Sequence, residues 1–203
     1  MIFKAPDGAT QLGPDEMVGL KFSHVTTRDE LNELEQSNIQ QGLLWLTRYH
    51  GGDILSAEFV CELHKRLFGD VWEWAGTFRQ HETNIGVEPS RITALLHNLL
   101  EDARYWTENN TYMPLEAAAR FHHRMVAIHL FPNGNGRHAR IAADAFLEHC
   151  FDHSPIEWEG GFDLQADPRG RTAYIDALRD ADQGDYGPLL KFVGFHKDGL
   201  ARN

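Results

Sequence analysis

The stretch from His129 to Arg140 carries the residue types that could do chemistry in this chain. A histidine, which is a nitrogen base, comes before a loop that contains Gly134 and Gly136. Two arginines, Arg137 and Arg140, follow the loop. Glycine lets a backbone approach a ligand closely, and the unpaired amides that open a following helix form an anion site with the helix dipole. The two arginines are three positions apart and therefore share one face of the first helical turn. This set favours the binding of a di- or triphosphate.

His129 stands at the end of an apolar helix face, directly beside the predicted anion site. An imidazole in that place can remove a proton from a hydroxyl group near neutral pH. The helix C-terminus tends to raise the pKa of His129 and the arginines tend to lower it, so the sequence leaves the net shift open. The competing interpretation is a glycine-rich connection between two helices with solvated arginines; the histidine next to the loop favours the phosphate site.

Three other motif interpretations fail on their context. The spacing Gly134-x-Gly136-x-x-Ala139 matches the dinucleotide fingerprint loosely, but a helix and not a strand is predicted before it. The chain contains no Gly-x-x-x-x-Gly-Lys-Ser/Thr sequence and therefore no P-loop. A group of histidines lacks the His-Glu-x-x-His spacing and the acidic partner of a zinc site; these are His122, His123, His129 and His138.

Apolar periodicity and capping residues predict a mainly α-helical domain around this stretch. The predicted helices span residues 26–49, 56–69, 90–109, 114–129, 136–150, 168–181 and 188–196. Residues 77–89 read as two short strands around 83–86, a hairpin that must pack on the helices because a lone hairpin is marginal in water. We expect an N-terminal arm at 1–25, one domain at 26–196 and a tail at 197–203.

Composition limits the class of protein. The 203 residues are enough for one domain with a real core. The formal charge of −11 argues against a nucleic-acid binder but allows a local positive nucleotide site. No apolar run approaches the ~20 residues of a membrane span, and residues 1–21 lack the apolar segment of a signal peptide. The two cysteines, Cys61 and Cys150, are too few for a disulfide framework and fit buried thiols. From these features together we expect a cytoplasmic protein with no membrane partner.

The spacing His129-x-Phe131-x-x-Gly134-Asn135-Gly136-Arg137-x-x-Arg140 resembles the Fic/Doc family motif, His-x-Phe-x-Asp/Glu-Gly-Asn-Gly-Arg-x-x-Arg. The likeness extends over roughly residues 25 to 195, through the segments 63–79 and 174–189. Within the family, the chain is similar to the mobile mystery protein B group. The resemblance implies a helical Fic fold with a β-hairpin flap and a helix at 26–49 that could be inhibitory.

The resemblance also implies an activity, the transfer of AMP from ATP to a Ser, Thr or Tyr hydroxyl of a target protein, with Mg²⁺ as cofactor. His129 would be the general base, and Phe131 would anchor the loop. The implied nucleotide ligands are Gly134, Asn135, Gly136, Arg137 for the β-phosphate and Arg140 for the γ-phosphate; Asn135 and Arg137 also count as catalytic. The flap that would clamp the target backbone comprises Thr83, Asn84, Ile85, Gly86 and Val87.

The chain departs from the family pattern at two positions in the motif. Leu130 replaces the usual proline, and Asn133 replaces the acidic residue that usually binds Mg²⁺. A neutral amide oxygen is a weak ligand for a hard cation, so Asn133 is a weak magnesium candidate and the metal could bind through the ATP phosphates. The retained Gly136-Arg137 pair argues against the kinase branch of the family.

An inhibitory glutamate of the family type would block Arg140 from the helix at 26–49. Glu35 and, after it, Glu33 are the candidates, chosen by their place on that helix and not by a motif match. The competing interpretation is a solvated acidic helix face.

Two alternative functions remain open at this point. One is a non-catalytic nucleotide-binding or regulatory module, in which Asn133 has ended the chemistry. The other is a phosphodiester hydrolase that removes AMP from a modified protein. The sequence leaves open the target protein, the base of the nucleotide and the oligomeric state.

Overall fold

The computed structural model describes residues 17–158 and 168–195. Within these ranges the chain is mainly α-helical and contains no β-strand, which confirms the predicted helical class. The helices are α2 (Arg28–Leu46), α3 (Ala57–Phe68), the 3₁₀ turn η1 (Pro89–Arg91), α4 (Ile92–Glu108), α5 (Pro114–Ile128), α6 (Asn135–Phe151), α7 (Pro168–Asp182) and α8 (Gly187–Phe192).

The helices begin where the sequence places capping residues. The Thr27 side chain accepts from the amide of Glu30, whose carboxylate accepts from Thr27 in return, so both groups of a capping box are present. Ser56 accepts from the amide of Phe59 at the start of α3. Pro114 occupies the first position of α5, where its missing N–H costs nothing. Capping residues close in sequence therefore determine where these helices begin. The predicted tail at 197–203 lies outside the described residues.

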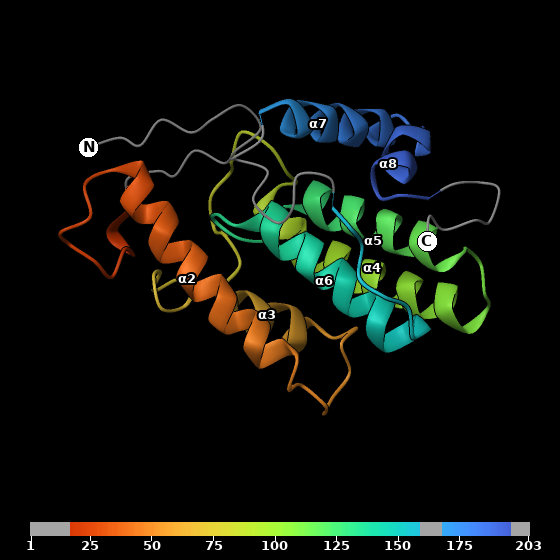
Figure 1. Ribbon diagram of the computed structural model, residues 1–203, viewed down its shortest axis with the longest axis horizontal. Helices are drawn as coiled ribbons and strands as arrows, with labels where there is room; N and C mark the ends of the chain where they lie inside the picture. Colours follow the sequence, from red (N-terminus) through yellow and green to blue (C-terminus); the bar gives the residue numbers. More distant parts are fainter. Residues whose placement is uncertain (1–16, 159–167, 196–203) are drawn as a thin grey trace.

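The helices form a central bundle with a pair of helices on either side (Figure 1). α5 and α6 pack against each other, and α4 packs on α5. α3 joins α2 to the bundle by contacting α6, and α8 joins α7 to it by contacting α5. This arrangement leaves the loop between α5 and α6 at the end of the bundle that faces both α2 and α7.

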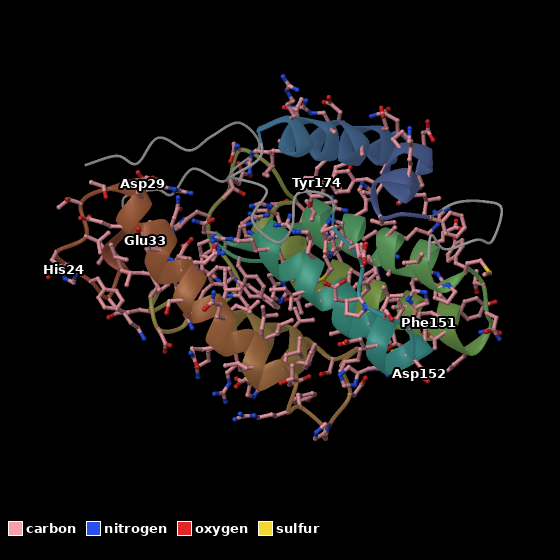
Figure 2. All side chains as sticks on the ribbon, viewed as in Figure 1. His24, Asp29, Glu33, Phe151, Asp152 and Tyr174 are labelled. Carbon is pink, nitrogen blue, oxygen red and sulfur yellow. The ribbon has the colours of Figure 1, made fainter. Side chains whose placement is uncertain are left out.

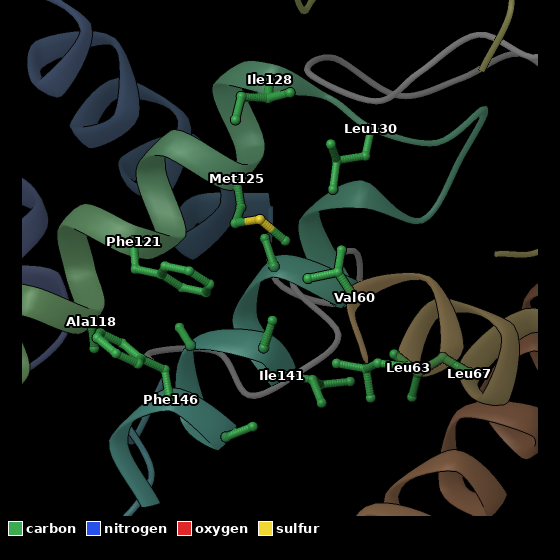
Figure 3. Close-up of a cluster of buried hydrophobic side chains, with 14 of the residues drawn as sticks. Val60, Leu63, Leu67, Ala118, Phe121, Met125, Ile128, Leu130, Ile141 and Phe146 are labelled. Atoms are coloured by element: carbon green, nitrogen blue, oxygen red, sulfur yellow. The ribbon is translucent and has the colours of Figure 1, made fainter. Parts of the chain in front are cut away.

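The core lies where α3, α5 and α6 meet (Figure 3). The rings of Phe121 of α5 and Phe146 of α6 pack at a tilt of 33° with centroids 5.0 Å apart, and both side chains are at most 2% exposed. Alanines on α6 allow close approach of its neighbours, and the larger buried side chains fill the space between. The core side chains drawn with labels are Val60, Leu63, Leu67, Ala118, Phe121, Met125, Ile128, Leu130, Ile141 and Phe146.

The predicted hairpin at 77–89 is wrong in its secondary structure, since no strand forms there. The backbone of this segment bonds to the α5 end and not to itself. The Arg79 amide donates to the Leu130 carbonyl at 3.0 Å, and the Val87 amide donates to the Ile128 carbonyl at 3.4 Å. A ladder across the segment would need those same groups, so the segment is an extended loop held on the helical body.

Charged side chains cover the outer surface of the helices (Figure 2). Glu33 is exposed on α2, as is Asp29 one turn earlier. In the part of the chain that is described, no helix has both the length and the apolar content that crossing a membrane requires.

Candidate active site

A cavity of about 400 Å³ opens where the loop after α5 meets the start of α2 and the inner face of α7. Arg28 lines it from α2, and Tyr174 lines it from α7. The structure brings together at this cavity every residue that the sequence assigned to the base and the anion site, namely His129, Gly134, Asn135, Gly136, Arg137 and Arg140. Asn133, the weak magnesium candidate, lines the same cavity.

His129 caps α5 in a left-handed conformation, with φ 59° and ψ 66°. Such a conformation is uncommon for a residue with a side chain and needs support from its surroundings. Arg79 supplies that support, because its Nε donates to the His129 carbonyl at 2.6 Å and its Nη2 donates to the Val87 carbonyl. Arg79 therefore holds the proposed base and the 77–88 loop together. Sequence reasoning did not single out Arg79, since the His129 carbonyl that it binds is 50 positions away.

Burial and positive charge keep the His129 imidazole neutral. The side chain is 3% exposed. Burial, and then the nearby Arg79 charge, lower the pKa of His129 to about 4, against a smaller opposing effect of a hydrogen bond with the Val126 backbone. The sign that the sequence left open is therefore a lowered pKa. At pH 7 the imidazole is therefore neutral, and its unprotonated ring nitrogen can accept a proton.

The loop keeps its shape through side chains that act as backbone partners. Asn135 accepts from the Phe131 amide at 2.9 Å and donates to the Phe131 carbonyl at 2.7 Å, so it encloses that residue from both sides. The Phe131 ring is fully buried and stacks on His64 with centroids 3.7 Å apart. Asn135 and Phe131 thus fix the loop.

His64 of α3 is a second residue that sequence reasoning missed. Its Nε2 donates to the Asn133 carbonyl at 3.0 Å and its Nδ1 accepts from the Gly76 amide at 3.0 Å, which fixes the tautomer. Burial, and then the neighbouring His138, lower the pKa of His64 well below its usual range. The neutral ring therefore connects the motif loop to the segment before the 77–88 loop. A histidine at a helical core position is the only sequence signal for this role.

The first turn of α6 presents its amides to the cavity. The first hydrogen bond inside the helix runs from the His138 amide to the Gly134 carbonyl at 2.9 Å, so the preceding amides have no carbonyl of their own helix to bond. Gly134 has φ +77°, and a Cβ there would lie 2.6 Å from the Phe68 ring. Only glycine fits this turn, which brings the backbone amides to the cavity wall.

Arg137 and Arg140 both line the cavity but have different surroundings. Arg137 Nη2 makes a 2.7 Å ion pair with Glu35 Oε2, and its guanidinium lies 4.9 Å from the Phe68 ring centroid. Arg140 is 4% exposed and its guanidinium lies 5.5 Å from the Tyr174 ring centroid. The two charges are therefore held in place before any ligand arrives.

Glu35 is buried at 1% exposure, whereas Glu33 faces solvent and does not reach the cavity. The other Glu35 oxygen accepts from the Trp72 indole N–H at 2.7 Å. We expected Glu35 to pair with Arg140, but the ion pair that forms is with Arg137. Arg137 and Arg140 are one turn of α6 apart and share a face, so helix spacing alone does not show which of them pairs with Glu35.

The Asn133 side chain and its surroundings do not fit a magnesium ion held by protein ligands. The Asn133 Oδ1 accepts from the Gly134 amide at 2.7 Å, which leaves an N–H₂ donor, and not an oxygen, as the remaining polar group of the side chain. Mg²⁺ takes oxygen ligands in an octahedral arrangement. Within residues 17–158 and 168–195 no group of three or more His, Cys, Asp or Glu side chains could hold a metal ion.

The predicted flap lies partly on the cavity. Ile85 and Gly86 line it, whereas Thr83, Asn84 and Val87 are not among the lining residues. Gly86 has φ +103°, and a Cβ there would lie 2.4 Å from the His129 Cβ. The loop backbone therefore rests directly on the proposed base.

Comparison with known proteins agrees with this geometry. Residues 54–147 match the model of the Fic/DOC family. The chain is 25% identical over 169 residues to the Protein adenylyltransferase Fic of Aedes aegypti, covering 81% of this chain and 32% of that protein. It is 27% identical over 156 residues to the Protein adenylyltransferase fic-1 of Caenorhabditis elegans, covering 72% of this chain and 28% of that protein. The chain thus spans about a third of the length of these curated relatives.

The fold is also shared with solved structures. BepC of Bartonella tribocorum, a VirB-translocated effector protein solved with bound AMPPNP, aligns with a TM-score of 0.66 and 19% identity over 89% of this chain and 96% of that one. The family match covers the core helices and the loop with its histidine and arginines. The family match over residues 54–147, the similarity to the curated relatives and the shared fold agree that this chain is similar to proteins of the Fic/DOC family.

Proposed function

We propose that this chain transfers AMP from ATP to a hydroxyl side chain of a target protein. The observation that carries the proposal is a neutral, buried histidine beside a helix N-terminus and two arginines, all lining one cavity of about 400 Å³. The names of the curated relatives, protein adenylyltransferases, support this activity, and the AMPPNP in the BepC structure supports ATP as the donor.

The proposed reaction needs one proton acceptor and a site for the phosphates. His129 takes the proton of the target hydroxyl, and the hydroxyl oxygen bonds to the α-phosphorus. The bond from that phosphorus to the bridging oxygen breaks, and pyrophosphate leaves with the electron pair. A positioned base of this kind contributes about 10²–10⁴-fold, and the fixed positive groups stabilise charge on the phosphates.

Roles for the remaining residues follow from their positions on the cavity. The loop of Gly134, Asn135 and Gly136 would hold the phosphates through the amides of Asn135 and Gly136, since the Gly134 amide donates to Asn133 Oδ1. Arg137 would lie at the β-phosphate and Arg140 at the γ-phosphate. Mg²⁺ would be bound by the ATP phosphates and not by the protein, and no step of the proposed reaction depends on it. A cytoplasmic location stays a prediction from the sequence.

The exposed part of the 77–88 loop is the proposed target site. Its residues from Asn84 to Gly86 are exposed. No ladder pairs their backbone within the described chain, and the Ile85 carbonyl accepts from the Thr83 hydroxyl at 2.6 Å. An extended target segment could therefore pair with this backbone by strand addition, which would bring its hydroxyl next to His129. The chemical class of target is a protein segment that carries an accessible Ser, Thr or Tyr.

Glu35 is the proposed inhibitory residue. Because its carboxylate is bonded to Arg137 Nη2, it competes with a phosphate for this arginine. In this proposal α2 restrains the site through Arg137 until nucleotide or another event releases the pair.

The test is label transfer from ATP that carries the label at either the α- or the γ-phosphate. We expect α-label alone on a protein acceptor, and a loss of about 10²-fold or more in His129→Asn. His97→Asn is the matched control, since His97 is exposed on α4. Transfer of γ-label would show a kinase, and release of AMP from an adenylylated protein would show the hydrolase. Nucleotide binding without any transfer would favour the non-catalytic module.

A further inference from the structure

The amide of Asn133 has one polar atom in use and one without a partner. Its Oδ1 accepts from the Gly134 amide at 2.7 Å. Its Nδ2 is buried, and no acceptor among the described residues bonds to it. The residue is 9% exposed and lines the cavity next to Gly134. A buried donor without a partner is unfavourable, so an acceptor that enters here gains affinity.

The hydrogen-bond network fixes which way this amide points. Rotation of the amide by a half turn would place its N–H₂ against the N–H of Gly134, two donors face to face. The main chain cannot shift to avoid this, because His64 Nε2 donates to the Asn133 carbonyl at 3.0 Å. Asn133 therefore presents a donor, and donors attract anions.

The charges around the cavity also favour an anion. Arginines line it from three helices, namely Arg28, Arg137, Arg140, Arg171 and Arg179. Asp182 is the one carboxylate that lines it in the described part of the chain, and His123 bonds to it at 2.8 Å. Arg28 adds a second buried donor, because its Nε also has no hydrogen-bond partner there. The lining thus supplies the positive charge that a divalent cation usually brings to a polyphosphate.

We propose that Asn133 is a direct phosphate ligand, with Nδ2 donating to a phosphate oxygen, and that this chain binds its nucleotide without a divalent cation. The inference rests on the proposed function, since it assumes a nucleoside triphosphate in the cavity. It assigns to Asn133 an anion-binding role in place of the weak metal-binding role that the sequence predicted.

The matched variant is Asn133→Asp, which keeps an oxygen for the Gly134 amide and replaces the donor by a negative acceptor. Titration calorimetry with AMPPNP on the full chain, once in EDTA and once in Mg²⁺, measures the effect as a ratio of Kd values. We expect the wild-type Kd to change by less than about threefold between the two conditions. In EDTA, Asn133→Asp should bind at least about tenfold more weakly than wild type.

Manganese paramagnetic resonance on the wild-type chain gives a readout that needs no variant. Without nucleotide we expect no bound Mn²⁺, and this arm together with the wild-type titrations decides the matter should Asn133→Asp fail to fold. A wild-type Kd that rises tenfold or more in EDTA, or an Asn133→Asp Kd equal to that of wild type, would overturn the inference.

The two proposals fail in different ways. A wild-type chain that binds no AMPPNP in either condition overturns the inference and the proposed function together. Cation-dependent binding with intact label transfer overturns the inference alone. Cation-independent binding with no label transfer removes the proposed transfer and leaves the role of Asn133 standing.

Discussion

His129 is buried beside the Arg79 guanidinium, and both features favour the neutral imidazole. A pKa lowered to about 4 means that the base form persists as the pH falls from 7 to 5, whereas an ordinary histidine, with a pKa of about 6.5, is mostly protonated at pH 5. We therefore expect the His129 ring signal in an NMR titration to stay at its neutral position down to about pH 5. Loss of that signal in His129→Gln assigns it. A midpoint near 6.5 would contradict the burial argument.

Gly86 gives a second prediction for a single residue. A Cβ at this position would lie 2.4 Å from the His129 Cβ, and the φ of +103° is itself unfavourable for other residues. Gly86→Ala should therefore displace the base or the loop and lower the rate of AMP transfer by about tenfold or more, since small misplacements of reacting groups are costly.

Gly184 provides the matched control for this change. Its φ is +90°, but a Cβ there would meet no atom within 4 Å. Gly184→Ala therefore introduces a similar backbone strain away from His129, and its transfer rate should stay near that of wild type. Equal losses in the two variants would show that strain, and not contact with His129, causes the effect.

On the scale of helices, α2 carries Glu35, whose ion pair with Arg137 is the proposed restraint on the site. Glu35→Gln removes the charge that pairs with Arg137 and keeps an acceptor for the Trp72 indole. Removal of one partner of a buried ion pair costs about 3–5 kcal/mol of stability, while Arg137 becomes available to phosphate. We expect urea denaturation to show lower stability and label transfer to rise at least about tenfold, the factor that corresponds to 1.4 kcal/mol.

Glu33→Gln is the control for this prediction, because Glu33 is exposed on the same helix. It should change neither stability nor transfer measurably. A Glu35→Gln chain that transfers no faster than wild type would mean that the ion pair is structural, and the proposed inhibitory role would then be withdrawn.

The helices could be predicted because their signals are local. Thr27, Ser56 and Pro114 each mark a helix start within a few residues of sequence. The hairpin prediction failed because the backbone partners of the 77–88 loop come from the end of α5, about 40 to 50 positions away. Residues 77–89 read as two short strands around 83–86, but the pairing that makes a strand is a property of the tertiary structure.

The same division holds for the site. The loop from His129 to Arg140 is continuous in sequence, so its residues could be assigned together. His64 and Arg79 support that loop from other segments, and no local pattern distinguishes them from other core or surface residues. The partner of Glu35 likewise depends on how α2 lies across α6, which helical spacing does not specify.

For the whole molecule, buried histidines set the response to acid. Burial lowers the pKa of His122 to about 3 and those of His129 and His138 to about 4. The unfolded chain binds protons at these groups below about pH 6.5, and the folded chain does not, so stability falls as the pH drops through that window. We expect the free energy of unfolding in urea to fall by several kcal/mol from pH 7.5 to pH 5.

Asp144 opposes this trend and gives the matched variant. Burial raises its pKa to about 7, against donors from Ile156 and Trp158 that favour the ionised form. The folded state therefore binds a proton at Asp144 as the pH falls below 7, which adds stability in the same window. Asp144→Asn should make the loss between pH 7.5 and pH 5 steeper. A flat profile in wild type would refute the contribution of the histidines.

The contact between Glu35 and Trp72 means that this protein contains its own optical probe. The indole N–H of Trp72 donates to the carboxylate that holds Arg137, and the ring stacks on Trp74 with centroids 4.8 Å apart. Indole emission depends on the charge and hydrogen bonding at that nitrogen. A departure of Glu35 from Arg137 would therefore change the intrinsic fluorescence of the chain, so that the state of the restraint could be followed in real time, without a label and without a target protein.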